Sequence, residues 1–181
     1  MTKIDRNKIN SLAFIPLCTA IICVSSFFAL PLPFGGAALT LQSMAICLTA
    51  LCLKKEHSLC AVALYILMGL VGLPVFPGGT SGLSRLLSPV GGYYIGFLAA
   101  AFLISRFKGK SPSFKRYATT AVFIGIPAEH ICAVLFMCVY SHCSPYSAFM
   151  SLSLPFLAGD IIKAVAAAFV AVPLAKTVKK I

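Results

Sequence analysis

The chain has 181 residues, of which 60% are hydrophobic and only 10% are charged, and its mean hydropathy is +0.98. Soluble domains carry about 25% charged residues, so this composition excludes a soluble globular protein and indicates a single integral membrane domain over residues 1–181. The net charge of +11 does not indicate nucleic acid, because the basic residues lie beside apolar segments, where anionic lipid headgroups account for them.

Six apolar segments are close to the length that a helix needs to cross a bilayer, although some are only just long enough. Prolines mark several ends: Pro31 and Pro33 follow the first segment, and Pro155 opens the sixth, where a proline in the first turn is tolerated. We therefore predict an all-α membrane protein with six transmembrane helices. The predicted spans are residues 12–30, 37–53, 59–73, 91–105, 119–140 and 154–174.

The distribution of Lys and Arg between these spans predicts their orientation. Thirteen of the 15 basic residues fall before the first span, after the sixth, or in the second-to-third and fourth-to-fifth connections, which all lie on one side. Arg85 alone falls on the other side, and Lys163 lies within a span. The positive-inside rule then places both termini in the cytoplasm of a multi-pass protein of the cell membrane.

The external connection between the third and fourth spans is apolar, yet prolines and glycines interrupt it. Residues 74–94 read PVFPGGTSGLSRLLSPVGGYY, which is too apolar for a solvated loop and too broken for one helix. Non-helical backbone at membrane depth is tolerated where it lines a cavity. We therefore predict a partly inserted external loop that covers a site.

Asp160 and Lys163 lie one helical turn apart in the external third of the sixth span. Burying an unpaired charge in hydrocarbon is costly, so two opposite charges at this spacing need an explanation. One explanation is an ion pair that merely makes the helix tolerable, with Arg85 at the headgroups. The other, which we favour, is a ligand site that Arg85 joins from the same side of the membrane.

The charges of such a site predict its ligand. Arg85 and Lys163 together with Asp160 leave one surplus positive charge, which a monoanion would neutralise. The two cations suit a carboxylate, whereas an ionised aspartate only accepts hydrogen bonds and suits N–H donors. We predict a small amphipathic carboxylic acid with a polar N–H group, its apolar middle enclosed by Phe76, Tyr93, Tyr94, Phe97 and Phe156.

Three other polar residues within the spans leave alternatives open. Gln42 is compatible with a ligand contact or with a hydrogen bond between helices. Glu129 and His130 follow Pro127 and are compatible with a proton relay, or with a neutral or paired group at a proline kink, which we favour. If Glu129 is ionised beside the site, the positive surplus disappears.

No pattern in the chain predicts a metal, a cofactor or catalysis. The eight cysteines include no C-x-x-C spacing, which argues against a zinc or iron–sulfur site. The stretch Gly109-Lys110-Ser111 lacks the earlier glycine of a nucleotide-binding P-loop. Gly92 and Gly96 are spaced to allow a close approach of two helices.

Four stretches carry a resemblance to a known family: Pro31-Leu32-Pro33 with Thr40-Leu41-Gln42, Gly72-Leu73-Pro74-Val75-Phe76 with Gly78-Gly79, Ser88-Pro89-Val90-Gly91-Gly92-Tyr93-Tyr94-Ile95-Gly96-Phe97, and Leu154-Pro155-Phe156 with Gly159-Asp160-x-x-Lys163. At these residues the chain resembles the BioY proteins, the biotin-specific substrate-binding (S) components of energy-coupling factor (ECF) transporters. The family usually has a threonine where this chain has Val90.

The resemblance implies an outward-facing biotin site within six helices. It implies that Arg85 and Lys163 engage the biotin carboxylate and that Asp160 engages the ureido ring. The further candidates for substrate binding are Gln42, Tyr93 and Gly79.

The resemblance also implies transport powered by two ABC-type ATPases through a transmembrane coupling subunit. S components dock onto that subunit through an alanine-x-x-x-alanine surface on the first helix, for which Thr19-x-x-x-Cys23 is the nearest match. We therefore predict a biotin-binding carrier subunit, not an enzyme, which binds no metal, cofactor or nucleic acid.

Three alternatives remain beside this prediction. The first is a solitary proton-coupled carrier of a small amphipathic carboxylic acid that uses Glu129 and His130. An intramembrane enzyme would need a metal-binding carboxylate cluster, which the four acidic residues of the chain supply poorly. A purely structural subunit would leave the external ions without a purpose.

Overall fold

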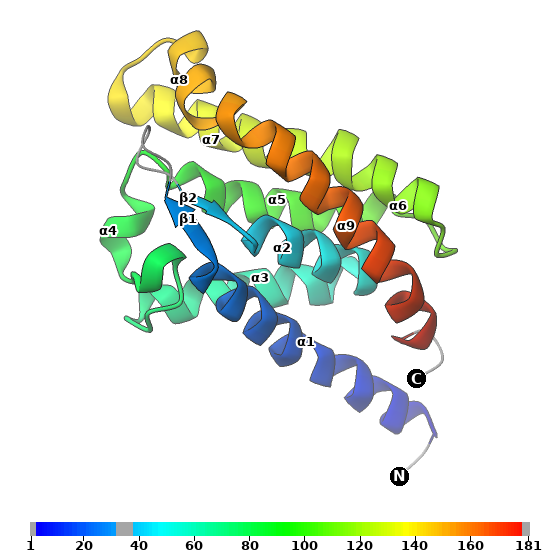
Figure 1. The fold of residues 1–181 in the computed structure, drawn as a ribbon. Helices are drawn as coiled ribbons and strands as arrows, with labels where there is room; N and C mark the ends of the chain where they lie inside the picture. Colours follow the sequence, from blue (N-terminus) through cyan, green and yellow to red (C-terminus); the bar gives the residue numbers. More distant parts are fainter. Residues whose placement is uncertain (1–2, 32–37, 179–181) are drawn as a thin grey trace.

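The structure is a computed structural model that describes residues 3–31 and 38–178, with the side chains of 12–29 and 40–177. Helices make up nearly all of it (Figure 1). They are α1 (Lys3–Phe27), α2 (Gln42–Cys52), α3 (Lys55–Leu70), α4 (Leu83–Leu86), α5 (Gly92–Phe107), α6 (Phe114–Thr120), α7 (Ile126–Ser141), α8 (Pro145–Leu152) and α9 (Leu154–Val178), with a 3-10 turn at Pro77–Gly79 and a π-helical turn at Ala121–Gly125.

The prediction of a helical protein is confirmed, and a helix overlaps each of the six predicted segments. Among the described residues, two helices are long and apolar enough to cross a membrane: the continuous Phe114–Ser141 and Leu154–Thr177. Shorter apolar helices cover Leu12–Phe27, Gln42–Cys52 and Gly92–Phe107. At 1.5 Å per residue the shortest of these rises only about 16 Å, roughly half of a bilayer's hydrocarbon core.

The second predicted span begins at Ala37, which lies outside the described residues, and the prediction of a helix was wrong for residues 38–41. Strand β1 (Ala29–Pro31) pairs with the antiparallel strand β2 (Ala38–Thr40), and Ala29 lies opposite Thr40. Pro31 has no backbone N–H and cannot continue a helix. Between α1 and α2 the backbone groups are instead satisfied by the pairing of the two strands. Pro33 lies outside the described residues. As a result α2 begins only at Gln42, which is already buried in the interior.

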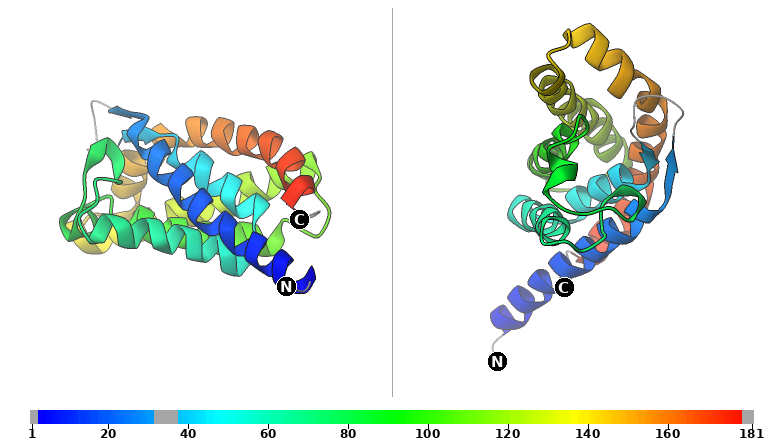
Figure 2. Two further views of the ribbon diagram at one scale, coloured as in Figure 1. Left: turned by 90° about the horizontal axis from the view of Figure 1, so that it is seen from below. Right: turned by 90° about the vertical axis from the view of Figure 1, so that its left-hand side faces the viewer.

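The two ends of the molecule differ in character. Helix α1 begins and α9 ends at the same end, whereas the β1–β2 hairpin, α4 and α8 lie at the opposite end (Figures 1 and 2). Arg85 belongs to α4 and therefore lies at the end of the molecule opposite the start of α1 and the end of α9.

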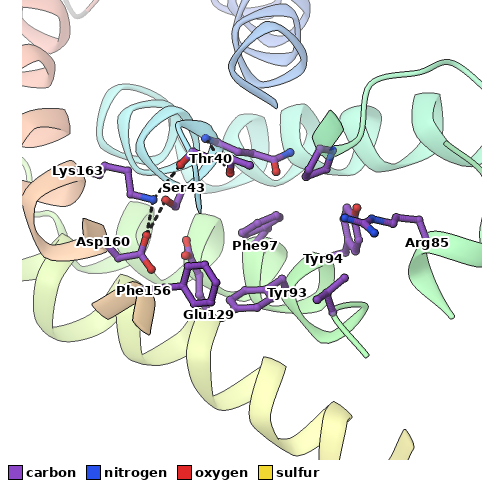
Figure 3. A pocket seen from close by; sticks show the side chains of 13 residues that line it. Thr40, Ser43, Arg85, Tyr93, Tyr94, Phe97, Glu129, Phe156, Asp160 and Lys163 are labelled. Carbon is purple, nitrogen blue, oxygen red and sulfur yellow. Dashed lines mark hydrogen bonds and ion pairs between the residues drawn. The ribbon is translucent and has the colours of Figure 1, made fainter. Parts of the chain in front are cut away.

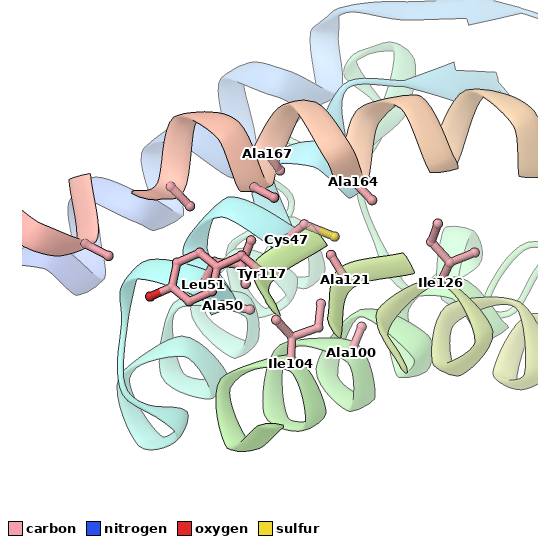
Figure 4. Packing of buried hydrophobic residues seen from close by; sticks show 13 residues of the cluster. Cys47, Ala50, Leu51, Ala100, Ile104, Tyr117, Ala121, Ile126, Ala164 and Ala167 are labelled. Carbon is pink, nitrogen blue, oxygen red and sulfur yellow. The ribbon is translucent and has the colours of Figure 1, made fainter. Parts of the chain in front are cut away.

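A stripe of alanines on α9 forms much of one core cluster (Figure 4). It consists of Ala164, Ala167, Ala168, Ala171 and Ala175, each at most 2% exposed, which pack with residues of α2, α5 and α6. Small side chains let helix backbones approach closely. The opposite face of α9 is also apolar, since Ile162 is 70% and Phe169 is 74% exposed. A helix that is apolar on both faces suits a membrane protein.

Helices α5 and α7 touch through glycines, as the spacing of Gly92 and Gly96 predicted. A Cβ atom on Gly96 would lie 2.8 Å from both the Cα and the carbonyl oxygen of Glu129, and one on Gly92 would lie 2.5 Å from the Cβ of Phe136. No side chain other than hydrogen fits at either position. The backbone of α7 is therefore held against α5 at the level of Glu129.

The predicted external loop folds as two short helical turns pinned to α3. Phe76 is fully buried and its ring fills the space above Gly69, where a Cβ would clash with it. The Gly82 N–H also donates to the Gly69 carbonyl at 2.8 Å. This anchoring presents α4 toward the interior.

Helix α8 was missed by the sequence analysis, which left residues 141–153 as a connection. Its start has an ordinary signature: the Ser144 side chain accepts from the Ser147 N–H at 3.2 Å, and Pro145 occupies the first helical position. At eight residues the helix is too short for its apolar pattern to stand out from the neighbouring spans.

Candidate functional site

A pocket opens between the first turn of α2, the 77–90 segment and helices α5, α7 and α9 (Figure 3). It encloses about 600 Å³ of space, part of it open to solvent. Its walls combine aromatic side chains with a few polar groups. The lining residues are Thr40, Gln42, Ser43, Pro77, Arg85, Val90, Tyr93, Tyr94, Phe97, Glu129, Phe156, Asp160 and Lys163.

Asp160 and Lys163 form an ion pair on α9, which the sequence analysis named as the alternative to a ligand site. The Lys163 Nζ lies 2.6 Å from the Asp160 Oδ1, and the two side chains are 11% and 8% exposed. Lys163 also donates to the carbonyl of Thr40 at 2.9 Å. The hairpin end next to α2 thus holds the lysine in place, and both charged groups line the pocket.

The Asp160 carboxylate accepts further hydrogen bonds from two other helices. The Ser43 hydroxyl of α2 donates to Oδ1 at 3.0 Å, and the His130 Nε2 of α7 lies 3.1 Å from Oδ2. Because an ionised carboxylate only accepts hydrogen bonds, His130 must donate from Nε2. Lys163, Ser43 and His130 thus hold the Asp160 carboxylate in one orientation. They also determine the direction of the lone pair that remains free to accept a hydrogen bond.

His130 lies behind the pocket wall and not on it. Its Nδ1 is 3.4 Å from the Tyr93 hydroxyl, which donates to the Leu152 carbonyl. The adjacent Glu129 does line the pocket. The structure therefore separates two residues that the sequence analysis treated together: one supports Asp160 and the other faces the cavity.

Three polar atoms of the pocket residues are buried without a hydrogen-bond partner among the described residues. They are the Nε2 of Gln42, the Nε of Arg85 and the Oε1 of Glu129. A buried unpaired donor or acceptor is costly, so groups of this kind beside a cavity are suited to meet a ligand. Gln42 lines the pocket as predicted, but Glu129 was left undecided by the sequence.

Arg85 lines the same pocket from its opposite end. Figure 3 places the guanidinium beside Tyr94, across the cavity from Lys163, with Phe97 between them. Among the described side chains it forms no ion pair, and its buried Nε has no hydrogen-bond partner. The expectation that Arg85 and Lys163 bind the same carboxylate does not fit this arrangement. The sequence indicates that both residues lie on the same side of the membrane, but it does not indicate how far apart they lie across the pocket.

The charge count also changes. The expected surplus of one positive charge comes from Arg85, Lys163 and Asp160, but Glu129 also lines the pocket. With all four groups ionised the surplus is zero, so the case for an anionic ligand group now depends on Arg85 standing apart from the acidic residues.

Two other expectations need correction. Gly79 does not line the pocket; its neighbour Pro77 does, while Gly79 takes a positive φ of 72° in the turn. Phe76 is fully buried in the core beside Tyr65 and Tyr94 and also stays outside the lining. The remaining four predicted aromatic residues, including Tyr93, do line it.

Thr40, Ser43, Pro77 and Val90 were missed as lining residues. Only Thr40 and Val90 had a signal, since both belong to stretches that carry the family resemblance. Ser43 is one of several serines within apolar segments, and its contact with Asp160 spans 117 positions of sequence. Local patterns do not reveal such a pairing.

Thr19 and Cys23 do not form a free surface. They are 3% and 7% exposed, and Thr19 donates to the carbonyl of Ala61 in α3 at 3.0 Å. Cys23 belongs to the core cluster that joins α1, α3 and α5. The predicted contact with a coupling subunit at these residues was therefore wrong, because the polar and small face of α1 packs inward.

Within the described residues, no three His, Cys, Asp or Glu side chains gather closely enough to hold a metal ion. The pocket instead combines an isolated cation, an apolar middle and a polar cluster. This arrangement suits binding of a small bipolar molecule.

Comparison with known proteins agrees with this geometry. The model of the BioY family matches residues 1–180. The chain belongs to the BioY family. Among curated relatives, the biotin transporter BioY of Thermotoga maritima is 36% identical over 158 residues, which cover 87% of this BioY chain and 91% of the relative.

Other relatives extend the comparison. The biotin transporter BioY2 of Lactococcus lactis subsp. cremoris is 44% identical to this BioY chain over 101 residues, which span 54% of that relative. A crystal structure of the S-component for biotin from an ECF-type ABC transporter superposes with a TM-score of 0.87 at 26% identity and covers 97% of this chain and 95% of that chain. The helical architecture of a membrane S component is therefore shared along almost the whole BioY chain.

Proposed function

We propose that this BioY protein is the S component of an ECF-type ABC transporter, which binds biotin from the external face for uptake. It is a transport component and not an enzyme. The observation that carries the proposal is the polarity of the pocket, with Arg85 at one end and the Asp160–Lys163 pair at the other. Biotin has the same polarity: a carboxylate, an apolar chain and a ring with two N–H groups.

The ligand would lie lengthwise in this pocket. Arg85 would take the carboxylate, for which a guanidinium is well suited, and the apolar chain would pass Phe97 and Tyr93. Lys163 has three N–H donors, of which Asp160 and the Thr40 carbonyl occupy two. One donor remains, which suits a single oxygen such as the ring carbonyl better than a carboxylate.

We propose six transmembrane helices with both termini in the cytoplasm of the cell membrane. The support is the charge distribution of the sequence together with the shape of the fold. The start of α1 and the end of α9 lie away from α4 and the hairpin, so the pocket end with Arg85 would face outward. The short α2 is compatible with this because its first turn faces the cavity and not lipid.

We further propose that two ABC-type ATPases drive uptake through a transmembrane coupling subunit. The second candidate is a solitary proton-coupled carrier, which the contact between His130 and Asp160 within the site favours. Either mechanism uses the same pocket, so binding alone does not separate them.

The first test is calorimetric titration of the purified protein with biotin in detergent, where saturable one-to-one binding is expected. Absence of binding would overturn the proposal. Uptake of labelled biotin by cells that express the chain then separates the two mechanisms. Loss of uptake when the ATPases are deleted supports the ECF mechanism, whereas loss with a protonophore but not with ATPase deletion supports the proton-coupled carrier.

A further inference from the structure

Glu129 has a buried acceptor that the protein leaves unused. The residue is 2% exposed, lines the pocket, and its Oε1 has no hydrogen-bond partner among the described residues. Figure 3 shows its carboxyl group pointing into the cavity between Asp160 and Phe97. Asp160 lies beside it in the same view, so Glu129 belongs to the polar end of the pocket.

The backbone holds this carboxyl group where it is. Gly96 of α5 lies directly against the Cα and carbonyl of Glu129. Pro127 and the π-helical turn at Ala121–Gly125 come just before it on the same helix. A π turn rotates the following residues relative to a regular helix, and such turns are frequent at functional sites. The π-helical turn therefore directs Glu129 toward the cavity. The contact with Gly96 keeps the backbone of Glu129 against α5.

Asp160, Lys163 and the Oε1 of Glu129 together leave three hydrogen-bonding positions vacant. A carboxylate has about four acceptor positions, and Lys163, Ser43 and His130 occupy three of those of Asp160. Lys163 retains one donor after Asp160 and Thr40. The Oε1 of Glu129 adds a second acceptor. These three residues thus offer one donor and two acceptors.

A cyclic urea presents the complementary set. Its two N–H groups diverge on either side of the carbonyl, so one carboxylate placed beside the ring reaches only one of them. We infer that Glu129 accepts the second ring N–H of the ligand, opposite the one that Asp160 accepts, and so makes the site specific for a ring with two N–H groups. This inference rests on the proposed binding of biotin and identifies Glu129 as a residue that recognises the ring of the ligand.

The test compares biotin with its two singly N-methylated analogues, in which one or the other ring nitrogen lacks its proton. Calorimetry is performed on the wild type, Glu129→Leu and Glu129→Gln, with Glu56→Gln, an exposed site at the start of α3, as the matched control. Leucine keeps roughly the volume of glutamate without an acceptor, whereas glutamine keeps an oxygen.

We expect each methylation to weaken binding to the wild type by about tenfold to a hundredfold, as for a buried acceptor left unsatisfied. Glu129→Leu should weaken biotin binding by a similar factor and should lose the penalty for one of the two analogues while keeping the other. Glu129→Gln should lose less affinity than Glu129→Leu, and Glu56→Gln should match the wild type. Selective loss of one penalty is not expected if Glu129 only supports the fold.

The inference fails if Glu129→Leu binds biotin like the wild type, or if it keeps both methylation penalties. If that variant does not fold, the wild type still decides, because equal binding of biotin and either methylated analogue overturns the inference. A wild type that does not bind biotin at all overturns the proposed function itself, which distinguishes the two failures.

Discussion

The Lys163 ammonium bridges two elements: it lies 2.6 Å from the Asp160 carboxylate one turn earlier on α9 and donates at 2.9 Å to the Thr40 carbonyl at the end of the hairpin. Both charges are almost fully buried. Neither residue therefore tolerates the loss of its partner in the way that an exposed ion pair would.

The first prediction separates folding from binding at this pair. Lys163→Ala and Asp160→Asn should each weaken biotin binding by about 2–3 kcal/mol, because a buried charged hydrogen bond loses a partner. Asp160→Leu alone should lower the stability of the empty protein by about 3–5 kcal/mol, while the double variant Asp160→Leu, Lys163→Met recovers much of it. Thermal unfolding in detergent and titration with biotin measure the two effects.

A double variant as unstable as Asp160→Leu would indicate that the fold needs the pair for more than mutual neutralisation. Retention of biotin binding by the double variant would contradict the site assignment.

The second prediction concerns Arg85 and the orientation of the ligand. Arg85→Ala should weaken biotin by about 1.5–3 kcal/mol, as expected for a charged hydrogen bond, but should leave biotin amide, which has no carboxylate, nearly unchanged. Lys163→Ala should weaken both ligands equally. Arg106→Ala, an exposed arginine at the other end of α5, is the control, and competition binding provides the readout.

Equal losses for the acid and the amide in Arg85→Ala would show that the carboxylate does not lie at that end.

The third prediction tests the contact between α5 and α7. Gly96→Ala places a methyl group 2.8 Å from the backbone of Glu129, so the helices must separate, at a cost of about 1–3 kcal/mol. Biotin binding should fall with stability because the pocket wall moves. Ile95→Ala, on the exposed face of the same helix, should change neither. A Gly96→Ala protein with wild-type melting temperature would contradict the close packing.

The fourth prediction concerns Lys108, whose Nζ donates to the carbonyls of Ala50, Leu51 and Leu53. These carbonyls end α2 and have no partner within the helix, so the ammonium acts as a C-terminal cap. Lys108→Met should lower the melting temperature, with a loss of about 1–3 kcal/mol, without altering ligand preference. Lys110→Met in the same connection, where the lysine is exposed, should leave stability unchanged.

The helical content and the polar residues of the site were predictable because both depend on local patterns. Apolar length identified the helices that became α5 and α9, and the cost of buried charge singled out Asp160 and Lys163. Their pairing follows from helical spacing alone, and the structure agrees. Gln42 carried a signal for the same reason, as a polar side chain in an apolar segment.

Relations that depend on packing were not predictable. The position of Arg85 across the cavity from Lys163 depends on how Phe76 pins the external segment to Gly69. The side of α1 that carries Thr19 faces α3 instead of a partner. Sequence spacing identifies a face of a helix, but the neighbour that the face meets is set by the whole fold.

The direction of Glu129 also lay beyond local reasoning. Glu129 and His130 are adjacent in sequence, yet only one of them faces the cavity. The π-helical turn before them changes the helical phase, and a regular 3.6-residue period does not predict that change.

The glycine contact between α5 and α7 should make the pocket less tolerant of changes to the head of the ligand than of changes to its tail. Where backbone meets backbone, as at Gly96 and Glu129, no side-chain rotation can create room. Ligands with a bulkier head should therefore be rejected, whereas homologues with an altered tail length meet the Arg85 side chain on the single helical turn of α4, which can rotate where a packed backbone cannot.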